Sequence, residues 1–232
     1  IVPTKNERLS LPRVLEQFRG LDQVELIVTD GGSHDGTPEM AQRLGALVVR
    51  KSTPRQTIGQ ARNEGAALAR GRIFVFCDAD TQLAGPDAFL STMEALFQDP
   101  RLAAVVPRLE VFPEEAGWFD RLFHFCFNLG VRASFWLGIP SSGGQCQVVR
   151  REAFEAVNGY PEEMAHGEDS ALLKRLRLVG RVQFAGSWVV YHSPRRFRVW
   201  GYPKTLAISI KSFLAKIFLN REVLEEWERV GK

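Results

Sequence analysis

The chain has little cysteine and no cysteine pair of the kind that binds zinc. Cys77, Cys126 and Cys146 are spread over 232 residues, and no C-x-x-C spacing occurs. Such a small, odd and scattered set excludes a disulfide-stapled secreted fold and a structural zinc site. We therefore expect reduced thiols and a cytoplasmic protein.

Long apolar runs are also absent. No stretch reaches the ~18 residues of a membrane-spanning helix, and no signal-peptide pattern is visible. The chain opens on Ile1 without an initiator methionine and enters a strand-like segment at once, so we expect a longer natural N-terminus. With 45% hydrophobic and 25% charged residues, the composition is that of a globular protein with a sizeable core.

Acidic residues are missing between Asp169 and Glu222, whereas basic residues recur from Lys174 to Arg221. A stretch of one charge sign suits phosphate groups or an anionic surface, and a solvated basic face is the alternative. Residues 204–219 within it carry an apolar stripe of helical spacing. This predicts an amphipathic helix that covers a core or, as a second hypothesis, lies on a membrane.

Two common nucleotide-binding motifs are missing too. Neither G-x-G-x-x-G nor a P-loop occurs, which disfavours nicotinamide dinucleotides and P-loop chemistry. Instead, apolar strand-like runs stop at acids: "VELIVTD" ends at Asp30, and "RIFVFCDAD" ends at Asp78 and Asp80. Helix-like segments follow these strands, which predicts βαβ units and a parallel sheet with ligands at the carboxyl ends of its strands.

Asp78 and Asp80 are separated by one residue at a strand end. Two carboxylates this close repel each other unless a positive charge lies near them. Oxygen ligands of this kind suit Mg²⁺ or Mn²⁺, and an Asp-rich turn is the alternative. Later in the chain, "SSGGQCQ" predicts a flexible loop, and "GEDSALLKRL" predicts a helix with Glu168 and Asp169 at its N-terminus.

These segments resemble the motifs of family 2 glycosyltransferases. "IVPTKNE", "IVTDGGSHDGT", "ARNEGAALARG", "VFCDADT" and "GEDSALLKRL" occur in the family's order and spacing. The resemblance implies an α/β fold of the GT-A type, with a mostly parallel nucleotide-binding sheet flanked by helices. It also implies a nucleotide-diphospho-sugar donor, a divalent metal (Mg²⁺ or Mn²⁺) and inversion at the anomeric carbon.

The resemblance also predicts the domain organisation. We expect a single GT-A-like domain over residues 1–232. Its first half, residues 1–110, binds the nucleotide sugar. Residues 111–232 bind the acceptor and include the C-terminal amphipathic helix.

The resemblance further assigns roles to residues of the donor site. It places Pro3, Thr4, Asn6 and Glu7 around the nucleotide. It likewise implies that Asp30, with Gly31 beside it, hydrogen-bonds the base. Arg62 corresponds to the basic residue of the helix beside the donor.

The remaining assignments concern the metal and the chemistry. Asp78, Ala79 and Asp80 correspond to the family's D-x-D motif, whose acids bind the metal. Asp169 corresponds to the catalytic base. His192, at the end of a strand-like run, is a third metal ligand in some relatives, and a hydrogen-bonded structural histidine is the alternative.

Two departures from the family pattern bear on activity. Gly31 replaces the second acid of the common "DDGS" motif, and the Q-x-x-R-W signature of processive members is missing. A single sugar addition is therefore expected. A nucleotidyltransferase is the second enzyme class considered, but the Gly-rich, basic loop typical of that class is absent after the first strand. A degenerate nucleotide- or glycan-binding module is the third hypothesis, and the retained acids argue against it.

The acceptor is not identified by any motif. Aromatic residues crowd residues 118–136, next to the basic C-terminal region. They are consistent with a saccharide or lipid-linked acceptor, with peripheral contact to the inner face of the cell membrane, or with a core or homodimer face. We expect no nucleic-acid partner.

Overall fold

The computed structural model describes residues 1–51, 53, 55–164, 166–202 and 204. Its first sheet is parallel throughout: β1 (Val2–Thr4), β2 (Ile27–Asp30) and β3 (Leu47–Arg50) pair in that order. Thr4 lies opposite Asp30, so these two strands end at the same edge. The predicted parallel pairing is confirmed here. The predicted amphipathic helix at 204–219 lies, apart from its first residue, outside the described residues.

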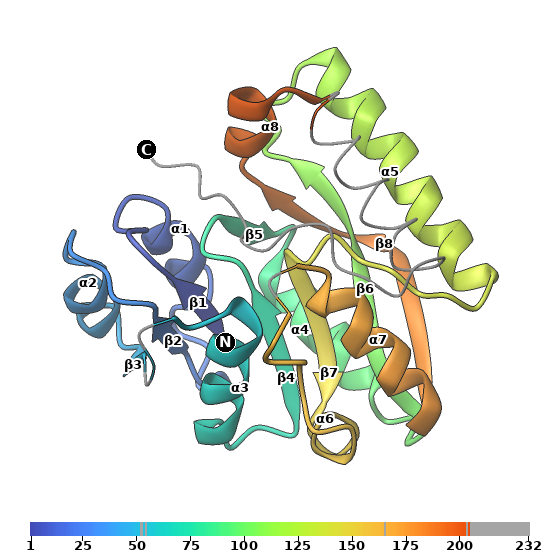
Figure 1. Ribbon diagram of the computed structural model, residues 1–232, viewed down its shortest axis with the longest axis horizontal. Helices are drawn as coiled ribbons and strands as arrows, with labels where there is room; N and C mark the ends of the chain where they lie inside the picture. The colour runs from blue at the N-terminus through green and yellow to red at the C-terminus, as the bar shows by residue number, and fades with distance from the viewer. Residues whose placement is uncertain (52, 54, 165, 203, 205–232) are drawn as a thin grey trace.

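The second sheet is mixed. Its strands in spatial order are β4 (Ile73–Cys77), β7 (Cys146–Arg150), β6 (Leu102–Val111), β8 (Arg181–His192) and β5 (Thr81–Leu83). Only β6 and β8 run parallel. The Ile1 main chain donates to the Val75 carbonyl (2.8 Å) and accepts from the Cys77 amide (3.0 Å), the bonding of a parallel pair. The two sheets are thereby joined edge to edge (Figure 1).

Helices cover both faces of this joined sheet. The core on one face contains residues of α1 (Leu11–Glu16), α2 (Thr37–Arg43) and α4 (Pro86–Leu96). The core on the other face contains residues of α3 (Ile58–Leu68), α6 (Arg151–Ala156) and α7 (Glu168–Val179). At one end of the second sheet lie α5 (Trp118–Trp136) and α8 (Arg195–Trp200) (Figure 1).

The central strand β4 buries both of its faces, as its lack of polar alternation predicts. Phe74 and Phe76 pack into the core beneath α6, where each ring contacts Phe154. Cys77 points to the opposite core, and its sulfur lies 3.7 Å from that of Cys146 on β7. Both thiols are free and buried.

Neighbouring segments set the ends of two helices. Gly36 occupies the N-cap of α2 with φ of 86°, and the hydroxyl of Thr37, the first residue of this helix, accepts a bond from the Glu7 amide. Leu68 is the last residue of α3 and is half exposed. Local spacing does not reveal such contacts, because they depend on which segment packs there.

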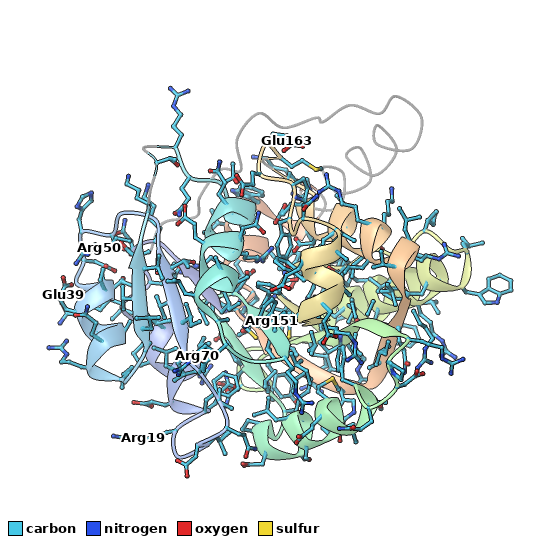
Figure 2. The ribbon with its side chains drawn as sticks, turned by 90° about the horizontal axis from the view of Figure 1, so that it is seen from below. Arg19, Glu39, Arg50, Arg70, Arg151 and Glu163 are labelled. Carbon is cyan, nitrogen blue, oxygen red and sulfur yellow. The ribbon has the colours of Figure 1, made fainter. Side chains whose placement is uncertain are left out.

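Charged residues line the edges of the fold. Arg50 on β3 pairs with Glu39 on α2 at 3.2 Å, and Figure 2 shows them together beside the first sheet. Arg151 donates to the Gly71 carbonyl at 2.8 Å and so ties α6 to the turn before β4 (Figure 2). Among the helices in the described part of the chain, none is both long and apolar enough to cross a bilayer.

Candidate active site

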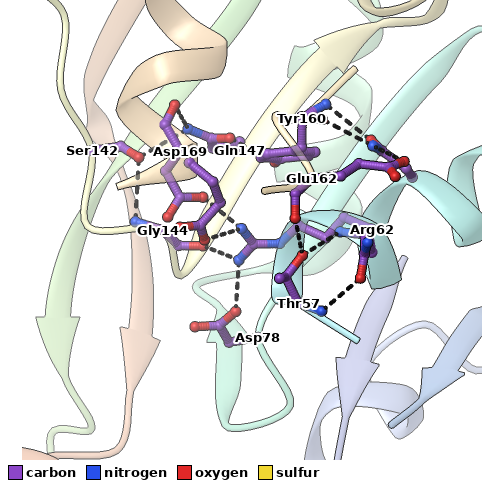
Figure 3. A network of polar contacts seen from close by, with 12 residues as sticks. Thr57, Arg62, Asp78, Ser142, Gly144, Gln147, Tyr160, Glu162 and Asp169 are labelled. Atoms are coloured by element: carbon purple, nitrogen blue, oxygen red, sulfur yellow. Dashed lines mark hydrogen bonds and ion pairs between the residues drawn. The ribbon is translucent and has the colours of Figure 1, made fainter. Parts of the chain in front are cut away.

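Arg62 is the centre of a cluster of polar side chains. It projects from α3, and its guanidinium is almost completely buried. One terminal nitrogen donates to Glu168 (3.1 Å) and Asp169 (2.6 Å). The other donates to Asp78 (3.0 Å) and to the Gly144 carbonyl (2.9 Å), as Figure 3 shows. The end of β4, the start of α7 and the loop before β7 therefore meet on one cation.

Two further residues fix the position of α7. The Arg62 guanidinium carbon lies 5.1 Å from the centre of the Tyr160 ring. The Tyr160 hydroxyl donates to Gln147 (2.7 Å), whose amide donates in turn to the main-chain carbonyl of Asp169 (3.2 Å). Neither role was predicted from the sequence. Tyr160 lies outside the recognised motifs, and Gln147, although it ends the segment "SSGGQCQ", acts through contacts with distant residues that local spacing does not reveal.

Glu168 and Asp169 occupy the first turn of α7, as predicted. The side chain of Glu168 is more buried, with 6% exposed against 13% for Asp169. Burial, reinforced by the neighbouring Asp169 carboxylate, raises the pKa of Glu168 to about 8. Glu168 is therefore mainly protonated at neutral pH.

The loop before β7, residues 141–145, packs directly on Asp169. Gly144 has φ of 85°, and a Cβ atom built on it would collide with the Asp169 carboxylate. On the other side of this loop, a Cβ on Gly143 would collide with Leu109 of β6. Glycine is thus required at both positions, because Asp169 and Leu109 lie too close to the loop for a side chain. The loop therefore borders Asp169, the expected base.

Asp78 and Asp80 follow β4 and remain partly accessible. Their side chains are 35% and 24% exposed, and Asp80 lies 3.6 Å from the Arg195 guanidinium of α8. Accessible carboxylate oxygens are the ligands that a hard divalent ion takes, and in this structure each of the two carboxylates lies beside an arginine. Within the described residues, no group of three or more acidic, histidine or cysteine side chains is arranged to hold a metal.

His192 lies near this motif but is directed away from it. It pairs with Thr81 across β8 and β5, is buried, and its Nε2 atom lies 2.8 Å from Nε2 of His124 on α5. Burial lowers the pKa of His124. The Nδ1 atom of His124 lies 2.8 Å from the Asp120 carbonyl, and that of His192 lies 3.1 Å from the Ser193 carbonyl. The two rings share a hydrogen bond between their Nε2 atoms. His192 would have to turn to ligate a metal, so that role stays a prediction.

The loops after β1 and β2 are bonded to each other. The Gly31 amide donates to the Thr4 carbonyl (2.8 Å), and the Asn6 amide donates to the Ser33 hydroxyl (2.8 Å). A Cβ atom on Gly31 would lie 3.3 Å from the Thr4 oxygen, so the two loops approach closely. Pro3 is half buried within β1, and Ala79 is buried beside the acids.

Asp30 is almost fully buried at the end of β2. Its carboxylate accepts bonds from the amides of Gly32 (3.1 Å) and Ser33 (3.0 Å), and from the Ser33 hydroxyl. In this arrangement Asp30 shapes its own turn. Its expected contact with a nucleotide base stays a prediction.

Glu7 connects the start of the chain to α8. Its carboxylate accepts bonds from Arg195 (2.9 Å) and from the Ser10 hydroxyl (2.6 Å). Arg195 thus lies between Glu7 and Asp80. The one-sign charge pattern indicated a cation in this region, but nothing in the spacing predicts its bond to Glu7.

A pocket of about 460 Å³ lies between β6 and α5. It is lined by polar and charged side chains of both elements, among them Arg108, Glu110, Asp120, Arg121 and Asn128. Asn128 bonds both main-chain groups of Leu109 on β6 and so fixes α5 over the pocket.

Solved structures share this architecture. A mannosyltransferase from Pyrobaculum calidifontis, in complex with GDP-Man and Mn²⁺, superposes with a TM-score of 0.62 at 22% identity, over 90% of this chain and 63% of that one. A Mycobacterium tuberculosis glucosyl-3-phosphoglycerate synthase, with Mn²⁺, UDP and phosphoglyceric acid, gives 0.63 at 22%, over 94% and 76%. The fold is therefore of the GT-A type.

Sequence relatives lead to the same group. The chain is 29% identical to the succinoglycan biosynthesis protein ExoA of Rhizobium meliloti, over 84% of this chain and 62% of the relative. It is 28% identical to a beta-monoglucosyldiacylglycerol synthase of Trichormus variabilis, over 77% and 40%. The chain thus spans about half the length of these curated relatives. The family model for glycosyl transferase family 2 matches residues 1–157. The chain belongs to this family.

Proposed function

We propose that the chain is the catalytic domain of an inverting glycosyltransferase. It would transfer a sugar from a nucleotide-diphospho-sugar to an acceptor hydroxyl. The observation that carries the proposal is the pair of bonds from Arg62 to Asp78 and Asp169. They hold the expected base next to the expected metal-binding motif.

Asp78 and Asp80 are the residues that would hold Mg²⁺ or Mn²⁺. When bound, the ion neutralises negative charge on the departing diphosphate. Related structures in complex with Mn²⁺ and GDP-Man or UDP support this assignment. The Arg195 guanidinium beside Asp80 adds positive charge on the same side.

Asp169 is the proposed general base. Its carboxylate takes the proton of the acceptor hydroxyl while the acceptor oxygen bonds to the anomeric carbon. The bond from that carbon to the diphosphate oxygen breaks, and its electron pair leaves with the diphosphate. Attack from the opposite face inverts the anomeric centre. Arg62 orients the carboxylate, and Gly144 leaves room beside it.

The acceptor is proposed to be a saccharide or a lipid-linked molecule. The relatives support this, since they include a succinoglycan biosynthesis protein and a beta-monoglucosyldiacylglycerol synthase. Because the Q-x-x-R-W signature of processive members is missing, we propose that the enzyme adds one sugar per acceptor.

Calorimetric titration tests the donor site. UDP-, GDP- and dTDP-sugars are titrated with Mn²⁺ or EDTA into wild type, Asp80→Ala and the control Asp22→Ala, whose carboxylate is exposed on a distant turn. We expect metal-dependent binding of one nucleotide, lost only in Asp80→Ala. Folded protein that binds none of them, or metal-independent binding equal in all three proteins, contradicts the proposal.

A transfer assay tests the base. Asp169→Asn is expected to bind the donor as wild type does but to lose about 100- to 10,000-fold in kcat. NMR of the product then gives its anomeric configuration. Unchanged turnover in Asp169→Asn, or retained configuration, would overturn the mechanism. Donor binding without any turnover in wild type would favour a binding module.

A further inference from the structure

Helix α5 exposes a stripe of large apolar residues and buries several polar ones. Its outer face consists of Trp118, Leu122, Phe125, Leu129 and Trp136, which are 50–88% exposed. These positions follow each other at steps of three, four or seven and therefore form one stripe. The opposite face, which contacts the protein, carries the buried polar side chains Asp120, His124, Asn128 and Ser134.

The orientation of α5 is fixed by hydrogen bonds. Asn128 bonds the amide (3.1 Å) and carbonyl (2.8 Å) of Leu109, and His124 bonds His192. Asp120 accepts from the Gly117 amide (2.8 Å) and caps the helix. Rolling the helix to bury its apolar stripe would break these bonds and leave buried polar groups unpaired. The hydrogen bonds of the inner face therefore hold the outer face of α5 in its exposed position.

The outer face is also large for an isolated surface. Of the 14 large apolar side chains that are exposed in the described residues, seven belong to α5 or to Leu137 directly after it. Contiguous apolar surface on this scale marks an interaction site. Figure 1 shows α5 running along the outside of the molecule beside β6 and β8.

The charged side chains around the outer face indicate which kind of partner it contacts. The only acid of α5, Asp120, is buried, and the charged side chains exposed on this helix are the cations Arg121 and Arg132. A tryptophan lies near each end, 18 residues apart, or about 27 Å along the helix. Apolar and aromatic side chains on one face with arginines beside them are the pattern of helices that lie in the plane of an anionic membrane surface.

We propose that α5 is a membrane-interface helix, whose outer face inserts among the headgroups and upper acyl chains of an anionic lipid bilayer. Arg121 and Phe125 line the pocket beneath α5 as well as its exposed side. Insertion would bring that pocket to the level of the headgroups. The relevance of this placement to a lipid-linked acceptor rests on the proposed function, whereas the membrane contact itself does not.

Co-sedimentation with vesicles tests the contact without donor, metal or acceptor. The full chain is expected to sediment with phosphatidylglycerol vesicles at low salt and far less with phosphatidylcholine vesicles. Leu129→Glu combined with Trp136→Glu should weaken binding at least about tenfold, through the loss of buried apolar area. Leu178→Glu, on the exposed side of α7, is the matched control and should bind as wild type.

Arg132 reports the electrostatic part of the contact. Arg132→Gln should weaken binding about fivefold, as expected for one charge near an anionic surface, and Arg132→Lys should restore it. Donor calorimetry on the same variants separates this proposal from the proposed function, because the outer face holds no residue of the donor site.

Three results would overturn the proposal. Vesicle binding that is absent, or that survives the Leu129/Trp136 double substitution, excludes α5 as the contact. A concentration-dependent dimer that the double substitution dissociates would assign the face to a second copy of the chain. A large loss of stability in urea unfolding of the double variant would show that the face is covered by the rest of the chain.

Discussion

Arg62 offers one buried cation to three carboxyl groups, and its removal would leave them without compensation. We expect Arg62→Met to lower the free energy of unfolding by about 3–5 kcal/mol, the usual effect of breaking a buried ion pair. Arg62→Lys should lose less, because it keeps the charge but not the fork that reaches both Asp78 and Asp169. Urea unfolding measures both. If Arg62→Met were as stable as wild type, Arg62 would not be needed to compensate the carboxyl groups around it.

Glu168 gives the molecule a specific pH dependence. Its pKa is raised to about 8 from an ordinary 4.5 by burial and by Asp169. Folded protein therefore holds a proton that unfolded protein releases, and the resulting stability is fully present below pH 4.5 and is lost as pH rises through about 8. Glu168→Gln, which stays neutral, should lose less stability between pH 6 and 9 than wild type does.

Thermal unfolding at pH 6 and pH 9 measures this difference. Glu163→Gln is the control, since that carboxyl group is exposed near the same segment (Figure 2). Equal pH slopes for wild type and Glu168→Gln would show that Glu168 ionises normally in the folded protein.

At the residue scale, the family motifs point to positions but not to their contacts. The acids Asp78 and Asp169 were predicted to share a site, and Arg62 does join them. The bonds of Asp30 to its own turn, and of His192 to His124, could not be predicted. Both depend on side-chain directions that are set by packing between distant segments.

At the scale of elements, α3 approaches β1 and β2 through a glycine. A Cβ on Gly65 would lie 2.5 Å from the Ile1 side chain and 3.1 Å from that of Thr29. Gly65→Ala should therefore destabilise the protein by about 1–3 kcal/mol through overpacking. Gly130→Ala is the matched helical control. It meets nothing within 4 Å and should stabilise by up to about 1 kcal/mol.

Urea unfolding of the two alanine variants should give changes of opposite sign. A neutral Gly65→Ala would mean that α3 can move away from the sheet at little cost. Because Arg62 lies on the same helix, such movement would also shift the guanidinium from its carboxylate partners.

Strands and helices of the first half were largely predictable, because their apolar runs and turn residues are local signals. The same local signals cannot reveal that β7 enters between β4 and β6 and makes the second sheet mixed. Strand order is decided by packing across the whole chain. Nor does the aromatic run at 118–136 disclose which face its helix exposes, since that is set by the polar bonds of Asn128 and His124.

At the scale of the whole molecule, the ion pair between Glu7 and Arg195 joins the start of the chain to α8. A double-mutant cycle with Glu7→Gln and Arg195→Met should give a coupling free energy of about 1 kcal/mol in urea unfolding. The pair is only partly buried, with side chains 17% and 25% exposed, so a large coupling is not expected. Strictly additive effects of the two substitutions would show that the ion pair contributes nothing to the free energy of unfolding.

The ion pairs of Glu7 and of Arg62 join distant parts of the chain, which affects folding during synthesis on the ribosome. The partners of the Glu7–Arg195 pair are 188 residues apart, and those of the Arg62–Asp169 bond are 107 apart. At a synthesis rate of about 5–20 residues per second, Arg62 emerges from the ribosome several seconds or more before Asp169 exists. Of the three acidic partners of Arg62, only Asp78 has been made during this interval, since Glu168 and Asp169 follow later. The half-made chain therefore lacks α7 over its apolar strands and is open to chaperone contact or premature association.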